Sequence, residues 1–231
     1  MTAPWRSPLA RALHRNRSKP HSRYLQLATV TPQGYPANRT VVFRGFLDNS
    51  DCLKFITDLR SGKITQLQHQ PHAEACWYFT KTREQFRLAG TVQIVTETDS
   101  DSSLQLARKI TWQNISDAAR SQFAWSYPGK PLDDRESAFH HNGIVKEDEE
   151  TRRQGDKENF LKIRQSSSRR DATPESFSVS NPNPDQPLDN FCLLLLTPHK
   201  VDHLELRGDR HNRCLYTLQA DNTWSIQPVN P

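Results

Sequence analysis

The chain has 231 residues, a formal net charge of +5 and a mean hydropathy of −0.82, so it is long enough for one well-buried core yet wetter than an average domain. Its apolar runs fall well short of the roughly 20 residues that cross a bilayer, which argues against a membrane protein. The first residues interrupt their apolar positions with arginines and lack the apolar core of a secretory signal, so we expect a cytoplasmic protein.

The positive charge is concentrated at the N-terminus and raises the question of a nucleic-acid partner. Residues 1–23 contain no acidic residue, and their basic residues are Arg6, Arg11, Arg15, Arg17, Lys19 and Arg23. No zinc-finger spacing, helix-turn-helix pattern or RNP-like aromatic motif accompanies them. We therefore interpret these residues as a general basic surface, and a nucleic-acid-binding barrel is the less favoured alternative.

The cysteine and histidine spacings give no metal signature. The cysteines lie far apart, form no CxxC pair and each fall in or beside an apolar run; they are Cys52, Cys76, Cys192 and Cys214. This pattern favours buried thiols over a disulfide or a metal site. His140 and His141 are adjacent and so point apart in a helix or a strand, and a metal site there would need distant ligands.

In chain order, the pattern first predicts a short amphipathic helix followed by a hairpin. Ser7 is the candidate N-cap, with Pro8 in the first turn and Trp5 and Leu9 on the apolar face. Residues 24–30 alternate and are rich in strand formers. The segment TPQGYP supplies a turn into a second strand at 39–46.

The next predicted unit is a strand at 53–57 that leads into a helix running to Gln70 and stopped by Pro71. The segment DLRSGK lies at the start of this helix, where free backbone N–H groups form a natural seat for a phosphate. It is not a Walker A loop, because the earlier glycine of that motif is Thr57 and the residue after Lys63 is Ile64.

The rest of the chain predicts a second hairpin, helices and further strands around one sheet. The hairpin joins strands at 73–80 and 85–95, and helices follow around 104–110 and 118–125. Residues 146–187 change to charged, serine-rich and proline-rich segments, which indicates a flexible insertion. Four strands are then expected at 190–196, 200–206, 213–218 and 223–227. Few βαβ alternations occur, so we expect a single domain over residues 1–231, mostly β with peripheral helices, built as an antiparallel barrel.

Polar side chains set into the apolar strands between residues 36 and 90 indicate a binding surface. Guanidinium, ammonium and hydroxyl groups at strand ends suit a flat, phosphorylated ligand, with the apolar wall against its rings. The alternative is that these groups are the solvated ends of ordinary barrel strands. On a flat strand, residues 39 and 44 point to opposite faces, so both reach one ligand only across a bulge or a strand end. The polar residues concerned are Arg39, Arg44, Thr57, Arg60, Ser61, Lys63 and Gln85.

An ordered set of motifs resembles a known family. The motifs RTVVFR, FIT, RSGK, REQFRLAG and NRCLY and the terminal W-S-I-x-P-V-N-P are similar in order and spacing to the pyridoxamine 5'-phosphate oxidase-like FMN-binding split barrels. The resemblance covers residues 24–231 apart from the insertion. It looks closer to a side branch of that superfamily without an assigned substrate than to the oxidase itself.

The resemblance implies FMN as cofactor and a homodimer with each FMN between two subunits. The strand that it places along the flavin consists of Arg39, Thr40, Val41, Val42, Phe43 and Arg44. It places Ile56 and Thr57 against the ring and ribityl chain, and Ser61, Gly62 and Lys63 at the phosphate. Gln85 is the implied glutamine that hydrogen-bonds the cofactor, and Arg213 is the implied arginine near the last strands.

Departures from the family pattern fall mainly on the substrate side. Arg44 stands in place of the oxidase's lysine. The tyrosine, arginine and serine with which the oxidase binds its substrate phosphate align near Trp112, Ser116 and Arg120 or Ser121 of this chain. The R-L-H substrate motif becomes Asp209-Arg210-His211, Leu204 stands where a tryptophan packs on the flavin, and Pro228 replaces the terminal arginine. The implied substrate residues are therefore Arg44, Arg120 and His211. The resemblance predicts an FMN-dependent oxidoreductase of unassigned small-molecule substrate, and the alternative is a flavin-binding module without turnover.

Overall fold

The computed structural model describes residues 2–131 and 182–231. One compact unit comprises Met1–Pro128 and Asn181–Pro231, and a second, Gly129–Ser180, falls almost wholly outside the described residues. Most of the predicted insertion at 146–187 and the histidine pair at 140–141 also lie outside them. The prediction of a single domain over residues 1–231 therefore stays a prediction.

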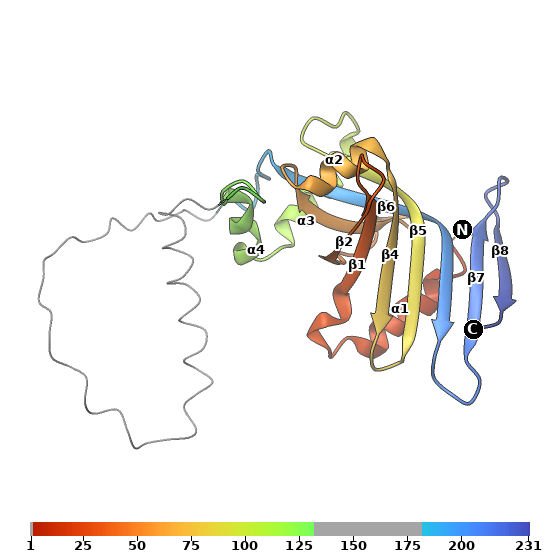
Figure 1. Ribbon diagram of the computed structural model, residues 1–231. Coiled ribbons are helices and arrows are strands. Elements are labelled where there is room, and N and C mark those ends of the chain that lie inside the picture. Colours follow the sequence, from red (N-terminus) through yellow and green to blue (C-terminus); the bar gives the residue numbers. More distant parts are fainter. Residues whose placement is uncertain (1, 132–181) are drawn as a thin grey trace, which may run out of the picture. The chain divides into compact units, whose positions relative to one another are not determined.

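The first unit is built on one sheet whose strand pairs are all antiparallel (Figure 1). Its order is β2-β1-β4-β5-β6-β7-β8, and β3 pairs with β6 off this path. The predicted fold class, a mostly antiparallel split barrel with peripheral helices, is confirmed. The strands are β1 Tyr24–Val30, β2 Pro36–Val42, β3 Leu53–Asp58, β4 His72–Phe79, β5 Glu84–Val95, β6 Phe191–Glu205, β7 Asn212–Leu218 and β8 Trp224–Val229.

Short helices cover the sheet and its ends. They are α1 Arg6–Asn16, η1 Pro20–Arg23, α2 Gly62–His69, α3 Ser102–Gln113, α4 Asp117–Ser121 and η2 Gln122–Ala124. The apolar face of α1 is buried as predicted, with Trp5 and Leu9 fully enclosed. The prediction of Ser7 as its N-cap is wrong: the cap is Trp5. The chain already turns at Ala3, whose carbonyl accepts a hydrogen bond from the Arg6 N–H at 3.0 Å, so the helix begins earlier.

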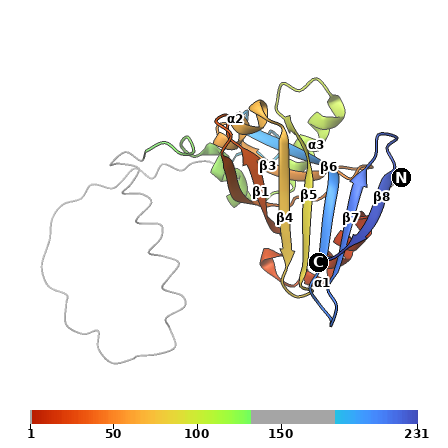
Figure 2. The same ribbon diagram turned by 45° about the vertical axis from the view of Figure 1, so that its right-hand side comes forward.

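Strand β6 is a single strand of 15 residues where the sequence predicted two. It pairs with β3 through its first half and with β7 through its second, so it belongs to both ends of the sheet. Figure 2 shows β4, β5 and β6 side by side, with β7 and β8 continuing the sheet. Pro198, which lies between the two predicted strands, is opposite Gly90 at an irregularity of the β5–β6 ladder. A proline is tolerated at such a bulge because the ladder hydrogen bond is already interrupted there.

Gly90 lets β5 and β6 approach closely at this irregularity. A Cβ atom added to Gly90 would lie 2.1 Å from the backbone oxygen of Thr197 and 2.8 Å from the Cα of Pro198. Both contacts are with backbone atoms, which cannot rotate away. The site therefore accepts only a residue without a side chain.

Strand β2 ends at Val42, although the sequence predicted a strand at 39–46. Gly45, with φ of +101°, breaks the strand, and Phe46 forms only an isolated bridge with Leu53. Glycine adopts this left-handed conformation at little cost. The shortened strand separates Arg39, which lies on β2, from Arg44, which lies beyond its end.

The cysteines are all free thiols in the structure. Cys192 is buried, whereas Cys52, Cys76 and Cys214 are half-buried. The prediction of buried thiols therefore holds fully for Cys192 alone. Burial raises the pKa of the Cys192 thiol to about 11, so it is protonated at neutral pH.

Candidate cofactor site

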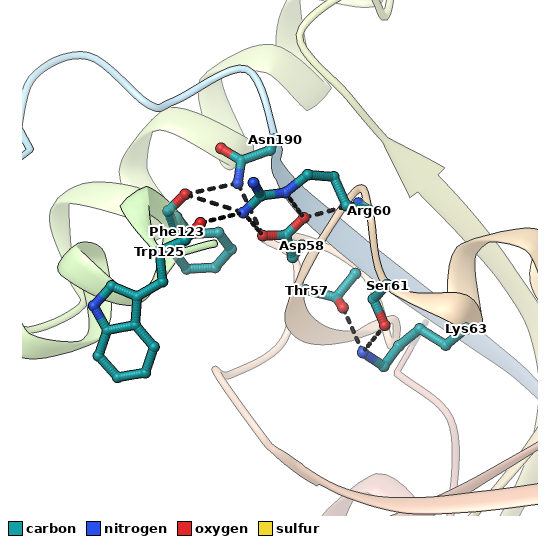
Figure 3. A network of polar contacts seen from close by, with 8 residues as sticks. All are labelled: Thr57, Asp58, Arg60, Ser61, Lys63, Phe123, Trp125 and Asn190. Atoms are coloured by element: carbon teal, nitrogen blue, oxygen red, sulfur yellow. Dashed lines mark hydrogen bonds and ion pairs between the residues drawn. The ribbon is translucent and has the colours of Figure 1, made fainter. Parts of the chain in front are cut away.

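The start of α2 and the end of β3 bring an ammonium group and two hydroxyls together (Figure 3). Lys63 Nζ donates hydrogen bonds to Thr57 Oγ1 at 2.6 Å and to Ser61 Oγ at 2.7 Å. Ser61 is the N-cap residue of α2, but its side chain does not cap the helix. The first backbone N–H groups of α2 therefore lack the side-chain acceptor that an N-cap serine usually provides.

Arg39 lies near this cluster and adds a second positive charge. Its guanidinium donates to Thr29 Oγ1 at 2.6 Å, to the Leu27 carbonyl at 3.1 Å and to Gln66 Oε1 at 2.7 Å. Gln66 belongs to α2, so this contact ties β2 to that helix. Burial lowers the pKa of Lys63, and the charge of Arg39 lowers it further.

These groups fit a phosphate. Among the described residues neither Arg39 nor Lys63 forms an ion pair, so an anion would relieve the repulsion between them. The space in front of Gly62 is open, since an added Cβ would meet no atom within 4 Å. The helix dipole of α2 also favours an anion at this end. We call Arg39, Thr57, Ser61, Gly62 and Lys63 the phosphate half-site.

Arg60 lies beside the phosphate half-site but is engaged elsewhere (Figure 3). Its guanidinium forms hydrogen bonds of 2.9 and 2.7 Å with the Asp58 carboxylate and donates to the Trp125 carbonyl at 3.1 Å. Asn190 donates to the same carboxylate and to the Phe123 carbonyl. This network joins β3 to the η2 region and the start of β6, so the charge of Arg60 is used in holding the fold.

We expect Asp58→Asn to lower the free energy of unfolding by about 1–2 kcal/mol at pH 7, because it removes a charge-assisted pair. Burial raises the pKa of Asp58, but hydrogen bonds from Arg60 and Asn190 outweigh it, so the pKa lies below its usual 3.8. This stabilisation is therefore present above pH 3.8 and is lost as the pH falls through the folded-state value. Urea unfolding at pH 7 and pH 3 measures the effect, with exposed Asp48→Asn as the control. An equal loss for D58N at both pH values would contradict the assignment.

Gln85 and Arg213 lie on another part of the sheet. Gln85 is opposite Tyr78 on β4 and Leu204 on β6, and Arg213 is opposite Leu204 on its other side. Directly paired residues share a face, so these side chains form one row across β4, β5, β6 and β7. We call Tyr78, Gln85, Leu204 and Arg213 the outer-face row, since Tyr78 and Gln85 alternate with the buried positions of β4 and β5.

Asp202 holds the arginine of this row in place. Its carboxylate accepts bonds from Arg213 Nε at 3.0 Å and Nη2 at 2.8 Å, and from Arg87 Nη2 at 2.7 Å. Asp202 is only 5% exposed. The two guanidinium groups offset its charge, and burial raises its pKa less than their hydrogen bonds lower it.

One chain does not bring the phosphate half-site and the outer-face row together. Thr57 pairs with Cys192 and Gln85 pairs with Leu204, and these partners are twelve residues apart on β6. At about 3.3 Å per residue the path along the strand is roughly 40 Å. Both views show α2 and the β4–β5 turn at opposite ends of the sheet (Figures 1 and 2).

The chain is similar to the proteins of one known family. Residues 2–96 match the family model described as pyridoxamine 5'-phosphate oxidase, FMN-binding domain. The "Pyridoxine/pyridoxamine 5'-phosphate oxidase 2" of Arabidopsis thaliana is 34% identical over 233 residues, which cover 99% of this chain and 98% of that protein. The chain belongs to the pyridoxamine 5'-phosphate oxidase family. FMN is the cofactor of this family's domain, and this protein is an FMN-binding flavoprotein of the family.

One solved structure is similar to this chain in sequence and fold, and a second is similar in fold. A pyridoxamine 5'-phosphate oxidase-related, FMN binding protein of Nostoc punctiforme PCC 73102 is 48% identical, with 100% of both chains covered and a TM-score of 0.79. PhzG from Burkholderia lata 383 is 19% identical, with 100% of this chain and 94% of that chain covered and a TM-score of 0.66, and shares the fold. None of the helices within residues 2–131 and 182–231 has the length and apolar character needed to span a membrane.

The strand that the family resemblance assigns to the flavin has side chains on both faces. Val41 and Phe43 are buried in the core, whereas Thr40 is exposed and Val42 half-buried on the other face. Ile56 packs against a separate apolar cluster that contains Trp112, Phe123 and Phe191. The cofactor roles of these residues stay predictions.

The three substrate residues predicted from the oxidase family are in different surroundings. Arg44 Nε is buried without a hydrogen-bond partner among the described residues, and burial and then the charge of Arg23 lower the pKa of Arg44. His211 is exposed and lines a cavity of about 380 Å³ together with Arg213. Of these two residues, His211 is exposed to a ligand, whereas Arg44 has a buried Nε without a partner among the described residues.

Arg120 caps the end of α3 instead. Its Nη1 donates to the carbonyls of Trp112 at 3.1 Å and Ile115 at 2.7 Å, and its Nη2 pairs with Asp117. It is 7% exposed. Its predicted role as a substrate ligand stays a prediction; within the described residues Nη1 and Nη2 are directed to the protein, whereas the buried Nε has no partner.

Sequence reasoning missed the residues that support this flavoprotein site. Thr29 and Gln66 orient Arg39, and Asp202 orients Arg213. Each is an ordinary polar residue on a strand or helix, and none stands next to the residue that it orients. Only the strand register shows that Asp202 lies beside the two arginines.

Proposed function

We propose that this protein is an FMN-dependent oxidoreductase that works as a homodimer. In this arrangement the phosphate half-site of one subunit and the outer-face row of its partner hold the same FMN. The observation that supports the proposal is the separation of the two groups along β6 within one chain. A two-fold interface would place each group of one subunit near the other group of its partner and give two equivalent sites.

The residues of the site divide the work of binding and orientation. Lys63 and Arg39 neutralise the phosphate, while Thr57 and Ser61 hold the ammonium group of Lys63 in place. Gln85 offers an amide that can donate to or accept from a flavin ring edge. FMN itself supplies the redox chemistry by taking up and releasing electrons or a hydride. No residue of the chain is required as a nucleophile.

A mixed-dimer experiment tests whether the site is shared. Lys63→Met and Arg213→Met each damage one of its two groups, and each variant alone is expected to retain little FMN. When the two variants are mixed and allowed to exchange subunits, half of the dimers are mixed, and each mixed dimer has one intact site. About a quarter of the wild-type flavin absorbance should therefore return on addition of FMN.

The control is each variant incubated alone under the same conditions, followed by gel filtration to measure the oligomeric state. A monomeric protein, or a mixture that binds no more FMN than its parents, would contradict the shared site.

The cytoplasmic location expected from the sequence stays a prediction.

Turnover is tested separately from binding. Relatives of this chain are named pyridoxine/pyridoxamine 5'-phosphate oxidases, so these phosphorylated pyridines are the first candidate substrates. Under anaerobic conditions a substrate should bleach the flavin absorbance, and oxygen should restore it at a catalytic rate. Bound FMN that no candidate donor reduces would instead support a flavin-binding module without turnover.

A further inference from the structure

A compact group of metal-ligating side chains lies at the end of the sheet where β5 begins and β6 ends. It consists of Glu84, His203 and Glu205, whose ligand atoms all lie within 4.8 Å of one another. Glu84 is directly opposite Glu205 in the ladder, and His203 is two pairs further along, opposite Phe86. Alternation directs all three to the face opposite to that of Gln85 and the outer-face row.

The distances within this group suit a metal ion. His203 Nε2 lies 3.0 Å from Glu84 Oε2 and 4.0 Å from Glu205 Oε1. Ligands about 2.1 Å from a tetrahedral metal lie about 3.4 Å apart, a value between those two distances. Small side-chain rotations would therefore bring the three donors to one ion. Of the two carboxylates, only that of Glu84 is within hydrogen-bond distance of the imidazole.

The surroundings hold these side chains in place. The His203 ring stacks on Phe86 with centroids 4.0 Å apart and an interplanar angle of 11°. Asn212 Nδ2 donates to Glu205 Oε2 at 3.3 Å, and Glu84 accepts a hydrogen bond from Thr82. Thr82 is fixed in turn by Asn16 at the end of α1, which donates to its hydroxyl at 3.0 Å. Outer contacts of this kind orient ligands in metal sites.

Two cavities give access to the group. One of about 200 Å³ is lined by Arg15, Thr82, Glu84, Glu205 and Arg207. The other, of about 380 Å³, is lined by both His203 and Glu205. The arginines favour ionised carboxylates, which is the ligand form, but they also repel a cation. The two effects on cation affinity oppose each other.

We propose that Glu84, His203 and Glu205 form a binding site for a divalent transition-metal ion. One imidazole and two carboxylates leave coordination positions open for water or a ligand, and this donor set suits Mn²⁺, Fe²⁺ or Zn²⁺. Binding replaces the hydrogen bond between His203 and Glu84. The site is separate from the phosphate half-site and does not depend on the proposed function.

Manganese is the best probe, because Zn²⁺ also has affinity for thiols such as those of the half-buried Cys52, Cys76 and Cys214. The FMN-loaded protein is freed of metal with a chelator, desalted and titrated with MnCl₂, and free Mn²⁺ is measured by electron paramagnetic resonance. We expect saturable binding of one Mn²⁺ per chain. Glu205→Gln should weaken it at least tenfold, and Asn212→Ala, which removes an outer contact, about tenfold.

Glu205→Gln is the decisive variant because the Glu205 side chain is 41% exposed, so an isosteric amide leaves folding intact. Exposed Glu97→Gln is the matched control and should bind like wild type. Absence of saturable binding, or equal affinity for E205Q and wild type, would overturn the proposal. The group would then be a histidine hydrogen-bonded to Glu84 without a role in metal binding. Equal weakening in E97Q and E205Q would identify surface adsorption and overturn it as well.

Discussion

Lys63→Met is expected to lower the affinity for FMN by roughly 10- to 100-fold, since hydrogen bonds from a charged donor contribute about 1.5–3 kcal/mol. The ammonium group of Lys63 is held by Thr57 and Ser61 and has no anionic partner among the described residues. Burial and the charge of Arg39 lower its pKa, and an incoming phosphate would restore it. The lysine is thus poised for an anion, and methionine keeps its length while removing its charge.

The measurement is a titration of FMN-free protein with FMN, followed by quenching of flavin fluorescence. Riboflavin, which lacks the phosphate, is the informative second ligand: K63M and wild type should bind it equally. Lys109→Met on the exposed side of α3 is the matched control and should leave FMN binding unchanged. Equal losses for FMN and riboflavin would remove Lys63 from the phosphate half-site and assign it a structural role.

Gly90→Ala is expected to destabilise the fold by about 2–3 kcal/mol, because the new methyl group would overlap the backbone of β6. The nearest atom, the Thr197 carbonyl oxygen, would lie 2.1 Å away. Relief requires β5 and β6 to move apart where the ladder changes register between Ala89 and Gly90. That shift would also disturb the pairing of β5 with β4 and of β6 with β7 and β3.

Thermal unfolding of the FMN-free protein, followed by circular dichroism, should show a midpoint lowered by roughly 5–10 °C. Gly62→Ala is the matched glycine control: an added Cβ there meets nothing within 4 Å, and the residue begins a helix. It should change the midpoint little or raise it slightly. A G90A protein as stable as G62A would show that the two strands separate easily at this point.

The sequence predicted the bounds of a strand or helix correctly where a single pattern marked them, such as alternation of apolar residues or a terminating proline. The alternation in residues 24–30 gave β1 with its observed bounds, and Pro71 ended α2 as expected. The two strands expected at 190–196 and 200–206 form one strand, because Thr197 and Pro198 between them also pair with β5. A proline in an apolar run reads as a break unless the register of its partner is known.

The charged residues of the candidate site illustrate the same limit. Arg60 and Lys63 begin and end the same four-residue motif, RSGK. The sequence alone does not distinguish which of the two side chains is free to bind an anion. Arg60 is occupied because Asn190 and the carbonyls of Phe123 and Trp125 come to it from distant parts of the chain. The division of charges into structural and ligand-binding groups is a tertiary property.

The pairing of β3 with β6 also sets the order in which the protein can mature. β3 carries Thr57, and within the described residues its strand partner is β6, which begins at Phe191. A chain emerging from the ribosome therefore completes the matched segment 2–96 long before β3 gains its neighbour. The pairing that supports the phosphate half-site forms only after residues 191–196 have been synthesised, so we expect FMN to bind late in the synthesis of the chain or after it.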